Sequence, residues 1–236
     1  MEPDNFTEIP FTVENLDRCV IRQAIFDAIK ACKKDFKGNL LDIGCGKMPY
    51  KNYLLSNSNI SSYTGLDIEQ AIVYDEQVKP DATWDGVSMP FEDNHFETAF
   101  ATEVLEHCPD PVIVLKETLR VIKSGGCFFF TVPFLWNLHE VPHDEYRYTP
   151  FALQRIFAEA GFTNIEIKAH GGWHASMAQM IGLWVRRAPL STGRRKILSR
   201  LLKPVMISLL KKDKRAITEF VEGQMITGLY GLAYKP

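Results

Sequence analysis

The stretch "LLDIGCGKMPY", residues 40–50, places a short apolar run directly before a turn that contains Gly44 and Gly46. A run of this length followed by glycines is typical of a buried strand in a parallel sheet. Glycines there let the backbone turn tightly and approach a ligand, and a following helix presents free N–H groups to an anion. The stretch predicts a strand–loop–helix unit for a nucleotide-like cofactor, although dinucleotide enzymes have a similar loop and both glycines can be plain turn residues.

Apolar strands alternate with amphipathic helices on both sides of this loop, which predicts a parallel sheet covered on both faces. Helical spacing runs through residues 14–35, and Pro111 begins a second helix that Gly125-Gly126 is expected to stop. A third helix has Thr149 as its cap, Pro150 at its first position and Gly161 beyond its end. Strands are expected at 39–43, 62–69, 81–85, 96–101, 127–133, 163–170 and 223–236.

The composition indicates a reducing compartment, with cytoplasmic location as the expectation. The five cysteines are scattered and form no C-x-x-C pair, which argues against a disulfide framework or a cysteine zinc site. The first residues are acidic and lack the apolar core of a signal peptide, and no run is long enough to span a bilayer.

Charge is distributed unevenly: residues 173–218 contain eleven Lys or Arg and one acid, Asp213, so they carry +10 and the remainder carries −12. The segment mixes these cations with Trp, Leu, Ile and Met. We expect a basic helical insertion that contacts an anionic membrane surface or an anionic, lipid-linked acceptor. The alternative is a helical insertion that packs on the core or forms an oligomer contact; the oligomeric state is not predicted.

Further motifs follow the glycine loop in a fixed order. Asp67 ends the second strand, where a carboxylate can accept both hydroxyls of a ribose. Pro49 occupies the position where a pyrophosphate-binding loop prefers a third glycine, which disfavours a nucleotide-dependent oxidoreductase. Asp85 opens "DGVSMPFEDNHFE", and "EVLEH", residues 103–107, follows the fourth strand.

With these blocks the sequence resembles the class I S-adenosylmethionine-dependent methyltransferases, in the type 11 branch that includes the ubiquinone/menaquinone methyltransferases. The resemblance covers roughly residues 38–170. It implies an α/β, Rossmann-like, doubly wound and mostly parallel seven-stranded sheet, with helices on both faces and a helical insertion before the last strand. One departure is Met48, where many relatives have a third small residue.

The resemblance also implies roles for individual residues. Asp42 supports the loop and the cofactor's amino group, Asp67 takes the ribose hydroxyls, and Asp85 takes the adenine amine; Asp85 and Glu103 could alternatively cap turns. His107 lies near the methyl group, unless it is a structural histidine. The full set of expected cofactor-binding residues is Asp42, Gly44, Cys45, Gly46, Asp67, Ile68, Asp85, Gly86, Thr102 and Glu103.

The acceptor is predicted less directly. An N/D-P-P-Y/F block, found in enzymes that methylate amino groups of nucleic-acid bases, is absent after the fourth strand, which makes nucleic acid an unlikely partner. A stretch of the form "HE.P.D..R.T" also occurs in bacterial relatives from surface-glycan pathways, so the resemblance favours a small-molecule, sugar or lipid-linked acceptor, methylated at oxygen or carbon. A non-catalytic protein of the same fold and an RNA or protein methyltransferase are the alternatives.

The segment "HEVPH", residues 139–143, matches the H-E-x-x-H pattern of zinc peptidases. That motif needs one continuous helix to place both histidines on one face, and Pro142 is incompatible with such a helix. We therefore predict no zinc-peptidase site and no metal. The segment is interpreted as the loop after the fifth strand, facing the cofactor. Acceptor-site candidates are His107, His139 and His143 as catalytic residues and Tyr50, Asp144, Tyr146 and Arg147 as substrate-binding residues; simple loop packing is the alternative.

A single domain is expected for residues 1–236. Its predicted parts are an N-terminal helical cap (1–37), a cofactor-binding core (38–172), the basic helical insertion (173–218) and a final strand (219–236).

Overall fold

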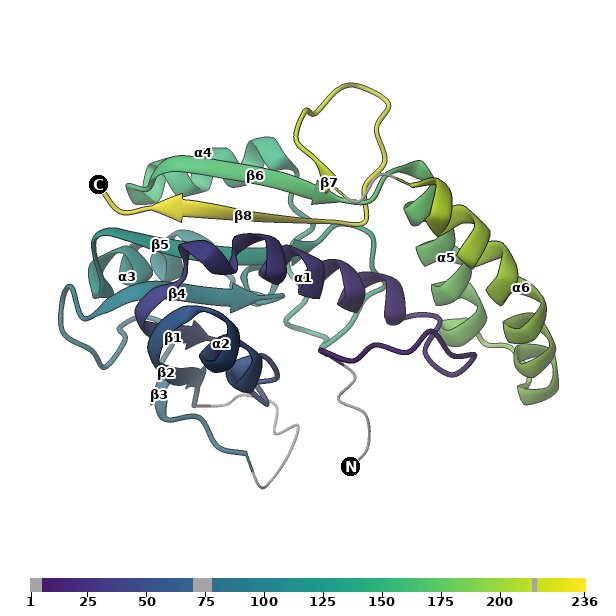
Figure 1. Ribbon diagram of the computed structural model, residues 1–236, viewed down its shortest axis with the longest axis horizontal. Helices are drawn as coiled ribbons and strands as arrows, with labels where there is room; N and C mark the ends of the chain where they lie inside the picture. The colour runs from purple at the N-terminus through teal and green to yellow at the C-terminus, as the bar shows by residue number, and fades with distance from the viewer. Residues whose placement is uncertain (1–5, 70–77, 214–215) are drawn as a thin grey trace.

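The computed structural model describes residues 6–69, 78–213 and 216–236, and it shows an eight-stranded sheet between two layers of helices (Figure 1). The strand order is β3-β2-β1-β4-β5-β8-β6-β7. The strands are β1 Lys37–Ile43, β2 Asn59–Ile68, β3 Ala82–Trp84, β4 Phe96–Thr102, β5 Ile122–Pro133, β6 Thr163–His170, β7 Ala216–Ile217 and β8 Gly228–Tyr234. The helices are α1 Cys19–Cys32, α2 Lys51–Asn57, α3 Pro111–Val121, α4 Pro150–Ala160, α5 Trp173–Arg187 and α6 Thr192–Lys212.

Strands β1 to β5 run parallel, and β8 is antiparallel to both of its neighbours, β5 and β6. The chain leaves β1 toward β2 on one side and returns to β4 on the other. The strand order therefore reverses between β1 and β4, and ligands of doubly wound sheets bind beyond the carboxyl ends at such a point.

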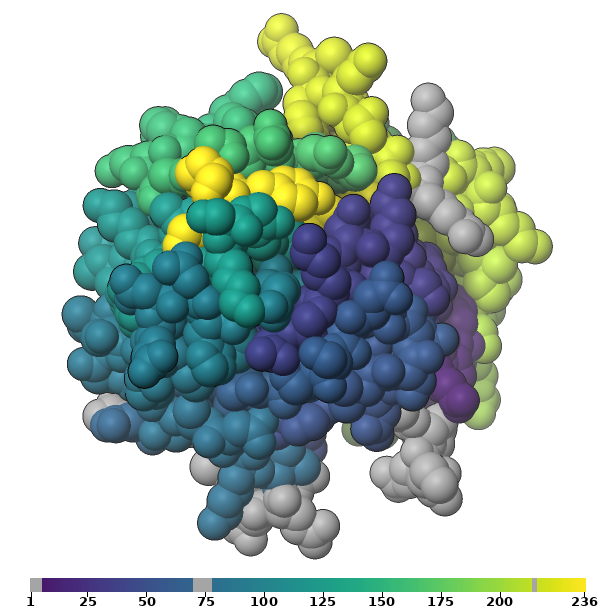
Figure 2. Space-filling model, turned by 60° about the vertical axis from the view of Figure 1, so that its left-hand side comes forward, coloured from purple at the N-terminus to yellow at the C-terminus, as the bar shows by residue number. Residues whose placement is uncertain are grey.

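The two faces of the sheet are covered by different helices because successive strand residues point in opposite directions. Phe128 and Phe130 of β5 pack in the cluster that includes α3 and α4. Phe129, between them, packs in the cluster that includes α1 and α2. Figure 2 shows α1 and α2 side by side on their face, with α6 at its right-hand edge. The mostly apolar segment 127–133 is thus buried on both faces, as its composition predicts.

Helix α4 begins and ends where its sequence predicts. The Thr149 hydroxyl accepts a hydrogen bond from the Ala152 N–H, and Pro150 occupies the first turn. Gly161 follows the helix with φ +105°, a left-handed conformation that favours glycine.

The prediction that Gly125-Gly126 stops α3 is wrong. The helix ends at Val121, and the glycines lie inside β5, which begins at Ile122. A Cβ on Gly126 would lie 2.7 Å from the Lys123 carbonyl oxygen and 2.9 Å from that of Glu97, so close backbone of β5 itself and of β4, not a helix end, requires glycine there.

The end of the chain also differs from the prediction. The last strand is confined to Gly228–Tyr234, and residues 219–227 form a loop. A short eighth strand, β7, pairs with the end of β6 inside the segment expected to be helical. The rest of that segment contains α5 and α6, which pack on each other beyond the carboxyl ends of the parallel strands (Figure 1). Residues 1–5 of the expected N-terminal cap and 214–215 of the insertion lie outside the described residues.

The segment of α5 and α6 packs against the N-terminal part of the chain. Leu16, Cys19 and Val20 form one apolar cluster with Val185 of α5 and Met206 of α6. Gly182 lies against the backbone of Leu16, and the Arg187 Nε donates to the Asp17 carboxylate at 2.7 Å. Among the described helices, none combines the length and apolar character needed to cross a bilayer.

Candidate active site

The loop after β1 has the conformation that its two glycines permit. Gly44 has φ +65° and Gly46 has φ +47°. A Cβ on Gly44 would lie 2.6 Å from a methyl carbon of Val104, which belongs to the loop after β4. Glycine at position 44 is therefore required both by the backbone angle and by the close approach of the neighbouring loop.

Asp67, at the end of β2, holds this loop in place. One of its carboxylate oxygens accepts a hydrogen bond from the Gly46 N–H at 3.0 Å, and the other accepts from the Ile68 N–H at 2.9 Å. Partial burial raises the pKa of Asp67. Each carboxylate oxygen can accept a second hydrogen bond, so the group retains capacity for ligand hydroxyls.

Ile68 follows Asp67 with 47% of its surface exposed, an unusual position for a large aliphatic residue at the end of a central strand. Cys45, in the loop itself, is buried, and its Sγ lies close to Gly65. The loop therefore presents one apolar side chain and backbone groups to the cleft, whereas its thiol faces inward.

Asp42, near the end of β1, is buried. The Tyr63 hydroxyl donates a short hydrogen bond to its carboxylate. Burial raises the pKa of Asp42 to about 7, against the lowering effect of the Tyr63 hydrogen bond. Asp42 is thus tied to Tyr63 of the neighbouring strand β2, and its support of the loop and of the cofactor's amino group stays a prediction.

This pKa shift predicts a pH-dependent contribution to stability. The folded protein keeps the Asp42 proton up to about pH 7, whereas the unfolded chain loses it near pH 4. The folded state binds more protons in this interval, so the contribution is complete below about pH 4 and is lost as pH rises toward 7. We expect Asp42→Asn to become more stable relative to the unmodified protein between pH 5 and pH 8, by about 1 to 3 kcal/mol.

Thermal melting of both proteins across this pH range measures the effect. Tyr63→Phe is the matched variant, because loss of its hydroxyl moves the Asp42 pKa further upward and extends the pH-dependent window. Parallel melting curves for Asp42→Asn and the unmodified protein at all pH values would contradict the assignment.

Asp85 and Gly86 follow β3. The Asp85 carboxylate is exposed and accepts from the N–H groups of Val87 and Ser88 at 2.8 and 2.9 Å. These two bonds lower the pKa of Asp85. The turn-capping interpretation is therefore realised in the structure, and one carboxylate oxygen makes both bonds. Gly86 has φ +85°, and a Cβ there would meet no described atom within 4 Å.

Glu103 follows β4 with φ +55°, which is uncommon for a residue with a side chain. Its N–H donates to the Thr131 carbonyl, and the Thr131 hydroxyl donates to the Glu103 carboxylate at 2.8 Å. Burial raises the pKa of Glu103 to about 7. Thr102, the last residue of β4, pairs in register with Thr131 of β5. The strained backbone at Glu103 is the kind of feature that clusters at functional sites.

The loop after β5, residues 134–149, folds onto the loop after β4. The N–H groups of Glu145 and Tyr146 both donate to the Glu106 carbonyl, and the Tyr148 hydroxyl donates to the Leu105 carbonyl. Residues 139–143 form turns and no helix, which confirms that "HEVPH" lacks the geometry of a zinc peptidase.

Two of the three expected catalytic histidines meet in this double loop. The His107 Nδ1 lies 2.8 Å from the His143 carbonyl oxygen, and the rings of His107 and His139 lie 4.8 Å apart. A carbonyl only accepts, so Nδ1 of His107 is the donor in this contact, and Nε2 faces the Glu106 and Glu140 carboxylates at 3.7 and 3.6 Å. The His143 side chain is exposed; its backbone oxygen makes this contact.

Asp144 and Arg147 form an ion pair beside these histidines. Two guanidinium nitrogens of Arg147 donate to the Asp144 carboxylate at 2.7 and 2.9 Å, which lowers the pKa of Asp144 to about 2. The same carboxylate accepts from the His139 N–H and lies 3.3 Å from its Nδ1. The Tyr146 hydroxyl donates to the Pro109 carbonyl, so Tyr146 also joins the two loops.

Tyr50 does not belong to this arrangement. Its side chain is 3% exposed and packs in the core against Phe100 and Phe6, which does not fit the expected role in substrate binding. Its place directly after the loop suggested the site, but the first residues of α2 turn the ring toward the sheet.

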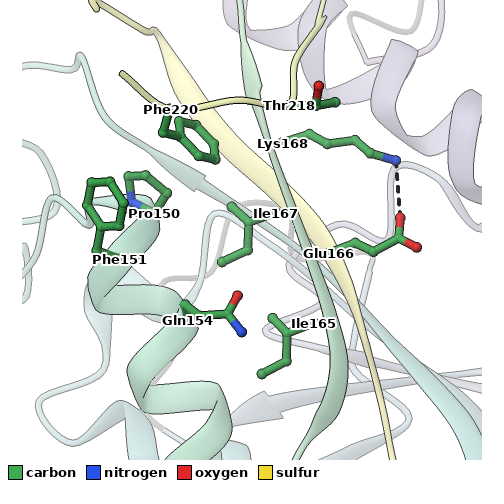
Figure 3. A pocket seen from close by; sticks show the side chains of 9 residues that line it. All are labelled: Pro150, Phe151, Gln154, Ile165, Glu166, Ile167, Lys168, Thr218 and Phe220. Carbon is green, nitrogen blue, oxygen red and sulfur yellow. Dashed lines mark hydrogen bonds and ion pairs between the residues drawn. The ribbon is translucent and has the colours of Figure 1, made fainter. Parts of the chain in front are cut away.

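A separate pocket of about 430 Å³ lies between α4, β6 and residues 218–220 (Figure 3). Phe151, Phe220 and Ile167 line it, and the Lys168–Glu166 ion pair lies at its side. None of the residues expected from the sequence to bind cofactor or acceptor lines this pocket.

Glu106 and Thr131 are the functional candidates that sequence reasoning missed. Thr131 lies in a plain apolar strand, which carries no signal. Glu106 is the second acid of "EVLEH", so the motif contained it, but only the fold shows that its carboxylate is 0% exposed beside His107.

One segment of the chain matches a known protein family. Residues 41–130 match the methyltransferase domain family. A rice (Oryza sativa) cycloartenol-C-24-methyltransferase is 35% identical over 100 residues, covering 38% of this chain and 28% of that protein. A demethylmenaquinone methyltransferase from Staphylococcus saprophyticus is 28% identical over 123 residues, covering 39% of this chain and 53% of that protein. The match therefore spans about half or less of these relatives.

Solved structures share the fold over most of the chain. A phosphoethanolamine N-methyltransferase from Haemonchus contortus with bound S-adenosylhomocysteine has a TM-score of 0.55 at 17% identity, covering 91% of this chain and 52% of that one. An S-adenosylmethionine-dependent methyltransferase from Thermotoga maritima has a TM-score of 0.58 at 15% identity, covering 94% and 91%. At these identities the likeness shows the fold alone. Residues 41–130 thus match the methyltransferase domain family, and the chain shares the fold of solved S-adenosylmethionine-dependent methyltransferases.

Proposed function

We propose that the chain transfers a methyl group from S-adenosylmethionine to an oxygen or carbon atom of a small-molecule, sugar or lipid-linked acceptor. The observation that carries this proposal is the glycine loop after β1, held by Asp67 on one side and closed on Val104 on the other. This arrangement lies where the strand order reverses, so a ligand there can meet the ends of β1, β2 and β4 together.

The residues around the loop fit the groups of this cofactor. Asp67 retains acceptor capacity for a ribose diol, and the exposed Ile68 offers an apolar surface for a flat ring. Asp85 keeps an oxygen beyond its turn-capping bonds for an exocyclic amine. On the β4 side, the Glu103 carboxylate is held by Thr131 at the end assigned to the methionine part.

Bound S-adenosylmethionine supplies a methyl group on a sulfonium; its transfer forms a bond from the acceptor atom to the methyl carbon and leaves a neutral thioether. The protein's part is to align the acceptor with that carbon, which accounts for much of the rate in such reactions. A hydroxyl acceptor must also lose its proton. The loops after β4 and β5 contain the groups that can manage it, including His107, His139 and the exposed His143.

Calorimetry with S-adenosylmethionine and S-adenosylhomocysteine, followed by turnover measured as release of S-adenosylhomocysteine, tests the proposal. We expect binding of both molecules and acceptor-dependent product release with sugar or lipid-linked hydroxyl compounds. Binding without turnover on any class of acceptor would favour the non-catalytic alternative. Failure to bind either molecule would contradict the proposal as a whole.

We also propose that the protein binds an anionic membrane surface, where a lipid-linked acceptor would lie. Exposed side chains of α5 and α6 support this proposal. Large apolar side chains recur at helical spacing on both helices and are exposed, although such residues are normally buried. Cations such as Lys196 and Arg200 are exposed in the same segment. Two relatives are named for cycloartenol and demethylmenaquinone, both apolar molecules. The exposed residues are Trp173, Met177, Met180 and Trp184 on α5 and Ile197, Leu201, Val205 and Ile207 on α6.

Vesicle flotation checks this surface. We expect the protein to float with phosphatidylglycerol vesicles at low salt, to detach as salt rises, and to ignore phosphatidylcholine vesicles, because both apolar insertion and charge contribute. The double variant Trp173→Ser/Trp184→Ser should lose most of the binding. A matched control is Phe151→Ser, which removes a similarly exposed aromatic ring from α4. No flotation at low salt, or equal flotation of the double variant, would contradict the proposal.

A further inference from the structure

The strongest feature outside the cofactor loop is a cluster formed by Glu106, His107 and His139. One ligand atom from each lies within 4.8 Å of the other two. We propose that this cluster is a binding site for a divalent transition-metal ion, with two imidazoles and one carboxylate as its ligands. The prediction of no metal rested on the "HEVPH" pattern and the scattered cysteines, and neither includes Glu106 or His107.

The Glu106 carboxylate provides the first argument. It is 0% exposed, and neither oxygen has a hydrogen-bond partner among the residues that the structure describes. A buried carboxylate without partners is costly, whereas a metal ion would compensate both oxygens. One of these oxygens lies 3.7 Å from His107 Nε2. Two atoms that bind one ion at about 2.0 to 2.2 Å are separated by roughly 3 to 4 Å, so this spacing suits shared coordination.

The orientation of His107 provides the second argument. Its Nδ1 donates to the His143 carbonyl, so Nε2, 3.7 Å from the Glu106 carboxylate, is the nitrogen on the side of the cluster. Metal-binding histidines commonly donate their other ring proton to a carbonyl or carboxylate, which fixes the ring and its tautomer. The Glu140 carboxylate lies 3.6 Å from the same Nε2 and adds negative charge around the site.

His139 lies beside the Asp144–Arg147 ion pair. Its Nδ1 lies 3.3 Å from the Asp144 carboxylate, which Arg147 holds by two hydrogen bonds. Nδ1 makes no hydrogen bond to a described residue at this distance, so an ion near the ring would also compensate a buried nitrogen. The Asp144–Arg147 pair holds the backbone of this loop through the His139 N–H and is thereby a positioning device.

Two imidazoles and one carboxylate suit Zn²⁺ in an open catalytic site or Fe²⁺ in a facial triad, and both leave positions for another ligand. That the open position takes an acceptor oxygen rests on the proposed function; binding of the ion does not. An acceptor hydroxyl on the ion would have its pKa lowered and would release its proton more readily before attack on the methyl carbon.

Titration of chelator-treated protein with Co²⁺, read by visible absorption, and with Zn²⁺, read by calorimetry, tests the site. We expect one ion per chain and a d–d absorption band typical of nitrogen and oxygen ligands. Glu106→Gln and His139→Ala should each weaken binding at least tenfold. Glu159→Gln and His95→Ala, which remove an exposed acid on α4 and an exposed imidazole before β4, should leave it unchanged.

His139→Ala changes a partly exposed side chain, so it remains informative if Glu106→Gln fails to fold. No bound ion, or equal weakening by the control variants, would overturn the site. S-adenosylmethionine affinity of the same preparations is measured in parallel, because its expected ligands do not include Glu106 or His139. A chain that binds the ion but not the cofactor contradicts the proposed function alone, and the reverse result contradicts the metal site alone.

Discussion

Replacing Asp67 with alanine is expected to reduce the affinity for S-adenosylmethionine at least about 100-fold. The carboxylate is assigned both ribose hydroxyls, and hydrogen bonds to a charged group contribute about 1.5 to 3 kcal/mol each. The substitution also removes the acceptor that fixes the Gly46 N–H at 3.0 Å, so the loop loses its anchor on β2. Both effects act in the same direction.

Calorimetry with Asp67→Ala, Asp67→Asn and the control Asp27→Asn separates these effects. Asparagine keeps one carbonyl acceptor in the same shape, so its loss should be intermediate. Asp27 is an acid on α1 that pairs with Lys30, and its replacement should leave cofactor affinity unchanged. Unaltered affinity in Asp67→Ala would remove the ribose assignment, and with it the main support for the site.

The second large effect is expected at Gly182 in α5. A Cβ there would lie 2.1 Å from the Leu16 carbonyl oxygen and 3.1 Å from the Met206 side chain. Backbone cannot move aside as a flexible side chain can, so Gly182→Ala must separate α5 from the N-terminal segment. We expect a loss of about 2 to 4 kcal/mol in the free energy of unfolding, comparable to other severe overpacking.

Chemical denaturation of Gly182→Ala and Gly193→Ala measures this loss. Gly193 lies at the start of α6, where an added Cβ meets no described atom within 4 Å. Alanine there should be neutral or stabilising by up to about 1 kcal/mol, because it is the better helix former. Equal stability of the two variants would show that α5 does not pack on Leu16 as described.

The cofactor loop illustrates how far local sequence can go. Its strand, glycines and flanking acid were predicted from residues 40–50 and 67, and the structure places Asp67 directly on the Gly46 N–H. The limits of α4 were equally predictable, because Thr149, Pro150 and Gly161 act on backbone groups within a few residues. In both cases the interactions that decide the conformation join residues that are close in the sequence or that lie at the ends of adjacent strands.

Predictions failed where a residue's partner is distant in the chain. Gly125-Gly126 has the composition of a helix stop, but Gly126 lies in a strand, against the carbonyls of Lys123 in that strand and Glu97 in the neighbouring one. Tyr50 follows the glycine loop directly, yet its ring packs against Phe100 in the core. Nothing near these positions in the sequence specifies which strand or ring will lie opposite.

The cluster of Glu106, His107 and His139 shows most clearly the difference between what the sequence predicts and what the tertiary structure decides. By itself the sequence determined the α/β fold, the cofactor loop and the absence of a helical H-E-x-x-H site, since each follows from local backbone preferences and the spacing of motifs. Only the tertiary structure decided that His139 lies beside Glu106 and His107, more than thirty residues earlier in the chain. The physical reason is that parallel strands bring their carboxyl ends to one edge, where the loops after β4 and β5 pack on each other and choose their own contacts.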